Sequence, residues 1–156
     1  MIMKRLIILM AAMAISFTLA AQEKTRTYRF GDIKRIDVSY TYHVYVTKGS
    51  SKEVEVVYDQ ALEDYMHVDW YAMGSKLVLR MDELPRKLRN NSFPDIKVYI
   101  SMDEIDEIEL SGASEIDFEG NYTASGLDVE LSGASALRGL SVKAGTMSAD
   151  CSGASS

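Results

Sequence analysis

Acidic residues recur at matching places in the last third of the sequence, and they are its first candidates for chemistry. Glu109, Glu130 and Asp150 each stand two positions before a Ser-Gly-Ala-Ser word, and Glu107 and Asp128 stand two positions earlier still. If these segments stack as neighbouring strands, each set forms an outward column whose like charges repel. Carboxylate oxygens are the ligands that a hard cation such as calcium prefers. One interpretation is therefore a calcium column at Glu109, Glu130 and Asp150, and the other is a solvated acidic face.

Paired acids also hydrolyse glycosidic bonds, but this requires two carboxyl groups at a fixed separation in a cleft that holds a sugar. Here the acids lie on a repetitive face, and the repeats contain only Phe118 and Tyr122 as aromatic residues. The sequence has no Gly-x-Ser-x-Gly word, and no base stands at a matching spacing from the repeated serines. We therefore predict no catalytic residues and no enzyme, with a polysaccharide-active enzyme as the alternative.

The histidines and the cysteine are isolated in the sequence. His43 lies on the polar face of an expected strand, where a solvated side chain is the simpler interpretation, and His67 has no second ligand at metal spacing. Cys151 takes the place of leucine in the third repeat, with no basic residue nearby to activate it. This favours a small buried hydrophobe over a reactive thiol. We predict no cofactor.

Two further groups of residues have both a structural and a binding interpretation. A polar stretch at 82–94 predicts a long loop, which is either a solvated connection or a contact for an anionic glycan or an acidic patch. Its basic residues are Arg86, Lys87 and Arg89. Three aromatic residues form either a surface patch for a sugar or, by default, part of the core. They are Tyr65, Trp70 and Tyr71.

The elements that position these groups follow from a repeated five-residue word. It begins at Leu110, Leu131 and Cys151, at spacings of 21 and 20 residues. A period near 20 is typical of a β-solenoid, in which no coil buries its apolar face alone and each stacks on the next. Glycine permits a sharp turn and close backbone approach there. The inward columns would be Ile108/Val129/Ala149 and Leu110/Leu131/Cys151.

Upstream of the repeats, alternating apolar and polar residues predict strands. The clearest alternation covers 36–46, and a single short helix-like segment lies at 61–66. The other expected strands are 54–58, 67–71, 76–81 and 96–102. The chain is therefore predicted to be all-β, with an N-terminal strand-rich region leading into a parallel β-helix, a solenoid whose coils of about 20 residues turn at Ser-Gly-Ala-Ser.

The N-terminus predicts export. Residues 1–21 read as a secretory signal peptide, with Lys4 and Arg5 before an apolar run and small residues at the cleavage site. This leaves 22–156 as a single domain without a stable membrane span. The formal net charge of −6 becomes −8 once Lys4 and Arg5 are removed, which argues against nucleic acid and anionic membranes as partners. We expect a periplasmic, outer-membrane-associated or extracellular location.

The last repeat ends at Ser155, one residue before the sequence ends at Ser156. An open last coil exposes unpaired strand edges. We expect either that the natural chain continues past Ser156, so that this C-terminus is truncated, or that a partner closes the end, including a second copy through oligomerisation at the open last coil.

Together these segments resemble the bacterial head GIN domain family of putative auto-transporter adhesins, over residues 28–156. The N-terminal pattern is carried by Phe30, Ile33, Ile36, Val38, Val44, Val46 and Gly49, followed by the strand Ile96–Met102 and by Ile105–Ser114 with its Ser-Gly-Ala-Ser word. The resemblance implies a right-handed β-helix-like fold in the envelope or outside the cell, and it supplies no catalytic residues.

We therefore predict a secreted or cell-envelope module for adhesion or binding, without catalysis. A surface glycan or an envelope protein is the expected partner. The alternatives are a structural envelope protein without a specific ligand and the polysaccharide-active enzyme.

Overall fold

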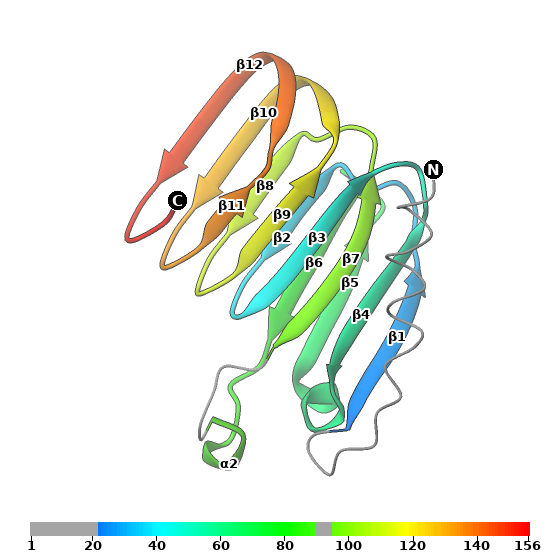
Figure 1. The fold of residues 1–156 in the computed structure, drawn as a ribbon, viewed down its shortest axis with the longest axis vertical. Helices are drawn as coiled ribbons and strands as arrows, with labels where there is room; N and C mark the ends of the chain where they lie inside the picture. Colours follow the sequence, from blue (N-terminus) through cyan, green and yellow to red (C-terminus); the bar gives the residue numbers. More distant parts are fainter. Residues whose placement is uncertain (1–21, 90–94) are drawn as a thin grey trace.

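The computed structural model describes residues 22–89 and 95–156, and most of these residues form β-strands (Figure 1). The predicted signal peptide lies outside the described residues, as do residues 90–94 of the predicted loop. The remainder of that loop contains the short helix α2 (Arg86–Arg89). The helix-like segment is confirmed as the 3-10 helix η1 (Gln60–Tyr65), whose first turn is capped by the Asp59 carboxylate accepting from the Ala61 amide at 2.9 Å.

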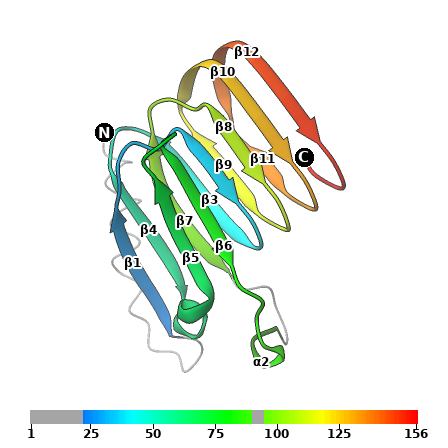
Figure 2. The same ribbon diagram turned by 180° about the vertical axis from the view of Figure 1, so that it is seen from behind.

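The strands form two six-stranded sheets that face each other as two layers (Figures 1 and 2). Sheet A has the order β1 (Glu23–Arg29), β4 (Glu53–Asp59), β7 (Ile96–Met102), β3 (Tyr42–Lys48), β9 (Glu115–Glu119), β11 (Ala136–Arg138). Sheet B has the order β12 (Ser141–Cys151), β10 (Asn121–Leu131), β8 (Glu107–Leu110), β2 (Arg35–Val38), β6 (Lys76–Met81), β5 (Met66–Tyr71). None of the helices in the described ranges is long and apolar enough to cross a membrane.

The all-β prediction fits in part, since the described residues are mostly strand with two short helices, but the predicted parallel β-helix is wrong. Both sheets are mixed, because β1 pairs with β4, β4 with β7 and β5 with β6 in the antiparallel sense. The strands also do not stack in chain order, since β2 lies between β6 and β8 and β3 lies between β7 and β9. Short reversals such as the turn between β5 and β6 produce antiparallel neighbours, whereas a solenoid coil requires a parallel crossover. The prediction treated the repeats as a separate solenoid, whereas their strands join the same two sheets as the N-terminal strands.

The predicted register of the last third is confirmed. β8, β10 and β12 pair in parallel, with Glu109 opposite Glu130 and Glu130 opposite Asp150. The apolar neighbours of these acids follow the same register and face the other sheet. Ile108 and Val129 are buried in this way. Each large aliphatic side chain removed from water in such a column contributes roughly 1.5–3 kcal/mol to stability.

The predicted burial of Cys151 is wrong. The residue pairs with the buried Leu131, as its register predicts, but its side chain is exposed rather than buried. Ala149 is exposed as well. The reason is that β12 is the edge strand of sheet B, so its inward side chains are covered by a neighbouring strand on one side only.

Glycine in the repeated turns is required by backbone contact. Gly133 has a φ of +70°, and a Cβ there would lie 2.6 Å from the carbonyl oxygen of Gly112 in the turn beneath it. That carbonyl accepts a hydrogen bond from the Ala134 amide at 2.8 Å, which fixes one turn on the next. Within the first of these turns the Ser114 hydroxyl donates to the Ser111 carbonyl at 2.8 Å. The small residues of the word therefore let successive turns stack at backbone distance.

Candidate functional site

The predicted acidic columns form a strip on the outer face of sheet B. Glu107, Glu109, Asp128, Glu130 and Asp150 line a hollow of ≈ 360 Å³ over β8, β10 and β12. No three histidine, cysteine, aspartate or glutamate residues within 22–89 and 95–156 form a group that could hold a metal ion. The calcium column at Glu109, Glu130 and Asp150 stays a prediction.

A lysine from the neighbouring half of sheet B neutralises one end of this strip. Lys76 Nζ lies 2.7 Å from a Glu107 carboxylate oxygen and 3.2 Å from one of Glu109. Partial burial opposes ionisation of Glu107, but the hydrogen bond and charge of Lys76 outweigh it and hold the pKa of Glu107 below its ordinary value. The strip is therefore an acidic surface whose Glu107 and Glu109 side chains form ion pairs with Lys76.

The outer face of sheet A carries a more organised set of side chains. His43 Nε2 lies 2.5 Å from Asp117 Oδ2, and His43 Nδ1 lies 3.2 Å from the Tyr45 hydroxyl. Arg138 approaches Glu115 through both terminal nitrogens, at 2.9 and 3.3 Å. Strand pairing places these groups together, because β3 lies beside β9 and β9 lies beside β11.

Aromatic rings continue this set across β3 and β7. The rings of His43 and Tyr45 stack with centroids 4.3 Å apart, and Tyr45 stacks on Tyr99 at 5.1 Å. We call His43, Tyr45 and Tyr99 the ring ladder. The strand register brings the two tyrosine rings together, since Tyr45 and Tyr99 are direct partners in the β3–β7 pairing.

Glu115 and Arg138, beside the ring ladder, are held in their ionised form, and the phenols stay neutral. The hydrogen bond from Arg138 is the main cause that keeps the pKa of Glu115 below its ordinary value. Partial burial raises the pKa of both Tyr45 and Tyr99. At neutral pH the face therefore presents the neutral phenols of Tyr45 and Tyr99 beside the ionised Glu115 carboxylate and the Arg138 guanidinium.

Sequence reasoning missed this face. His43 was expected to be solvated, but it is bound to Asp117, which lies 74 residues further along the chain. The alternation in the sequence correctly placed His43 and Tyr45 on one polar face. The missing information was the strand that lies beside them.

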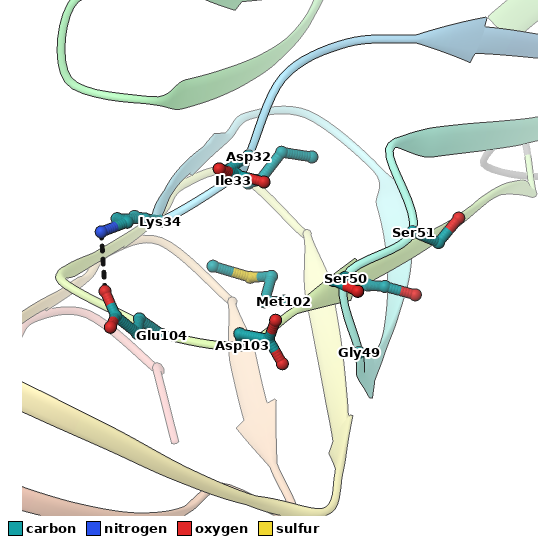
Figure 3. Close-up of a pocket in the computed structure, with 10 residues that line it drawn as sticks. Asp32, Ile33, Lys34, Gly49, Ser50, Ser51, Met102, Asp103 and Glu104 are labelled. Atoms are coloured by element: carbon teal, nitrogen blue, oxygen red, sulfur yellow. Dashed lines mark hydrogen bonds and ion pairs between the residues drawn. The ribbon is translucent and has the colours of Figure 1, made fainter.

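A smaller hollow of ≈ 210 Å³ lies where three connections meet at one edge of the molecule (Figure 3). The connections run from β1 to β2, from β3 to β4 and from β7 to β8. The residues that line it are Asp32, Ile33, Lys34, Gly49, Ser50, Ser51, Ser101, Met102, Asp103 and Glu104.

Comparison with known families decides the assignment. The model of the family described as putative auto-transporter adhesin, head GIN domain, matches residues 32–156. The chain belongs to this family. No curated protein matches the chain.

Solved structures share the fold of this head GIN domain at low sequence identity. A putative adhesin from Parabacteroides distasonis ATCC 8503 is 14% identical with a TM-score of 0.66, and the match covers 86% of this chain and 55% of that one. A putative adhesin from Bacteroides fragilis NCTC 9343 is 16% identical with a TM-score of 0.66, covering 90% and 63%. A putative lipid binding protein from P. distasonis ATCC 8503 is 15% identical with a TM-score of 0.51, covering 83% and 63%. The chain therefore spans about 55–63% of the length of these structures.

The other groups named from the sequence of the head GIN domain are dispersed. Arg86, Lys87 and Arg89 are exposed on α2, where Arg89 lies 3.6 Å from Glu83. His67 pairs with Asp82 at 2.9 Å.

The three aromatic residues divide between core and surface. Tyr65 and Trp70 pack against the core, and the Trp70 indole donates to the Asp32 carbonyl at 3.2 Å. Tyr71 is 52% exposed. The structure therefore does not unite the three into one sugar-binding patch.

Proposed function

We propose that this head GIN domain is a non-catalytic adhesin-type binding module of the cell envelope or cell exterior, and that its partner docks on the outer face of sheet A. The observation that carries the proposal is the ring ladder with its flanking Asp117, Glu115 and Arg138. Family membership and the adhesin-named structural neighbours support the binding role and the exported location.

The ring ladder suits binding because its side chains are already ordered. Association costs about 0.5–1.5 kcal/mol for each flexible side chain that is immobilised. Stacking holds Tyr45 between His43 and Tyr99, and the Asp117 contact holds His43, so this cost is reduced. Tyrosine and arginine are also the residues most enriched where binding energy concentrates in protein interfaces.

The alternation of charge on this face favours a specific partner. Acidic Glu115 and Asp117 lie beside basic Arg138 on one side of the ring ladder, and Lys97 lies opposite His43 on β7, the strand that carries Tyr99. A partner with complementary polar groups gains a favourable electrostatic interaction at each of these side chains, whereas a misaligned partner places like charges against each other. We expect that partner to be a surface glycan or an envelope protein.

The test is direct binding to defined surfaces. Purified protein is applied to a glycan array and to a mucin-coated sensor, a surface that presents glycan and protein together. We expect saturable binding that falls at least tenfold in the double variant Tyr45→Ala/Tyr99→Ala. The matched control is Tyr71→Ala, which removes an exposed tyrosine from sheet B and leaves binding unchanged.

Equal binding by the double variant and the wild type, with both folded by circular dichroism, refutes docking on sheet A. Absence of binding to every glycan and to mucin counts against the adhesin-type role.

A further inference from the structure

We propose that the hollow between the β1–β2, β3–β4 and β7–β8 connections is a second ligand site, and that it takes one neutral, polyhydroxylated ring such as a pyranose sugar. The site is separate from the ring ladder and does not depend on docking at sheet A. The volume of the hollow, the chemistry of its lining residues and the balance of their charges support this ligand.

The size of the hollow limits the ligand. Its volume of ≈ 210 Å³ is below the range of roughly 300–1,000 Å³ that encloses drug-sized ligands. A single ring-sized unit fits this space, and the rest of a longer chain would extend into solvent. The hollow lies where the three connections meet (Figure 3) and is partly open to solvent, which gives such an extension a way out.

The lining combines an apolar floor with a polar wall. Ile33 and Met102 are 5% and 1% exposed and form the boundary with the core. Around them stand the hydroxyls of Ser50, Ser51 and Ser101. A pyranose presents the same combination, because its axial C–H groups are apolar and its hydroxyls both donate and accept hydrogen bonds.

Carboxylates supply the strongest acceptors of this wall. Figure 3 shows Asp103 between the Lys34–Glu104 pair and the Ser50–Ser51 turn, with Asp32 on the opposite side. A carboxylate accepts two hydroxyl donors at once, and such charge-assisted hydrogen bonds are about twice as strong as neutral ones. Vicinal hydroxyls of a sugar match that geometry.

Charge balance separates a neutral ligand from a charged one. Each of the three lining carboxylates has a lysine partner, namely Glu104 with Lys34 at 2.6 Å, Asp103 with Lys48 at 3.9 Å and Asp32 with Lys52 at 3.9 Å. Lys48 Nζ also donates to the main-chain oxygen of Asp103, which holds that connection in place. Only Lys34 lines the hollow itself, but Lys48 and Lys52 behind the lining compensate the other two acids, so neither an anion such as phosphate nor a polyamine gains net attraction.

Gly49 offers a way to fill the hollow without disturbing the fold. Its φ lies outside the left-handed region, and a Cβ there would meet Ser101 at 3.7 Å, an ordinary contact distance. The amide of Gly49 bonds to the Met102 carbonyl at 3.1 Å, and any residue other than proline keeps that bond. Gly49→Leu therefore places a side chain in the hollow, and Ala72→Leu adds the same side chain to an exposed residue of the β5–β6 turn as the matched control.

The experiment is NMR titration of the isotope-labelled protein with glucose, galactose and N-acetylglucosamine, each to 100 mM. We expect amide shift changes concentrated at residues 32–34, 49–51 and 101–104, with millimolar Kd for at least one sugar. Gly49→Leu weakens this binding at least tenfold, Asp103→Asn weakens it at least threefold, and Ala72→Leu leaves it unchanged.

Two results overturn the proposal. The first is that no sugar shifts these amides, or that the shifts persist in Gly49→Leu. The second is that inorganic phosphate, spermidine or calcium binds the hollow more tightly than any neutral sugar. Mucin binding by the ring ladder is measured on the same variants, so failure of the hollow and failure of the sheet A face are distinguished.

Discussion

Replacement of Gly133 by alanine tests the stacking of the repeated turns. The residue has a φ of +70°, and the left-handed conformation costs a residue with a Cβ about 1–2 kcal/mol. The new Cβ would also lie 2.6 Å from the Gly112 carbonyl oxygen, an atom that the Ala134 amide binds. Relieving this overlap by a backbone shift adds about 1–3 kcal/mol. We therefore expect Gly133→Ala to lower the free energy of unfolding by about 2–5 kcal/mol.

Urea and thermal unfolding followed by circular dichroism measure this loss. At about 3 °C per kcal/mol for a chain of this size, Tm falls by roughly 6–15 °C. Gly49→Ala is the matched control, because its φ is ordinary and its Cβ has room. That change leaves stability within about 0.5 kcal/mol or raises it by up to about 1 kcal/mol through the unfolded state. A Gly133→Ala variant as stable as Gly49→Ala would refute the backbone contact.

Two further substitutions and one pH dependence give predictions about stability from the same structure. Leu131→Asp places an unpaired charge at a side chain that is 4% exposed, and we expect a loss of about 3–5 kcal/mol in urea unfolding; an unchanged midpoint would show that Leu131 is not in the core. Tyr42→Phe leaves the Arg80 carbonyl without the hydroxyl that donates to it at 2.7 Å, and we expect a loss of about 1 kcal/mol, which a neutral result would contradict. The pKa of Glu107 is lowered in the folded state, so its contribution to stability is full above the unfolded pKa and is lost as pH falls through the folded value. We expect Tm to fall between about pH 5 and 3, and to fall less steeply in Lys76→Met; identical slopes for the two proteins would contradict the pairing.

The register of the last third was predictable because a spacing of 20–21 residues aligns the same word on successive strands. Alternation then decides which side chains face inward, since a shift by one residue would expose the whole apolar set. Glu109 and Glu130 were placed correctly for this reason.

The sheet order of the first two thirds was not predictable by the same means. β3 pairs with β7 and β9, which share no repeated word with it, and alternation identifies a strand without naming its neighbour. Antiparallel strands at one end of each sheet also break the pattern that the repeats suggested.

The candidate sites depend on these long-range pairings. The Asp117 partner of His43 and the Tyr99 partner of Tyr45 are known only once β3 has its neighbours. The hollow likewise unites residues from 32 to 104 through three separate connections. The repetitive surface without a reaction centre, together with the family resemblance, predicted a binding module, whereas the proposed binding surfaces required the topology.

The most direct test of partner docking on sheet A is the binding isotherm on the mucin-coated sensor. It is measured for the wild type, Tyr45→Ala/Tyr99→Ala and Tyr71→Ala. We expect saturable wild-type binding, a loss of at least tenfold for the double variant and no change for Tyr71→Ala. Equal affinities for all three folded proteins would contradict the claim that the outer face of sheet A holds the partner.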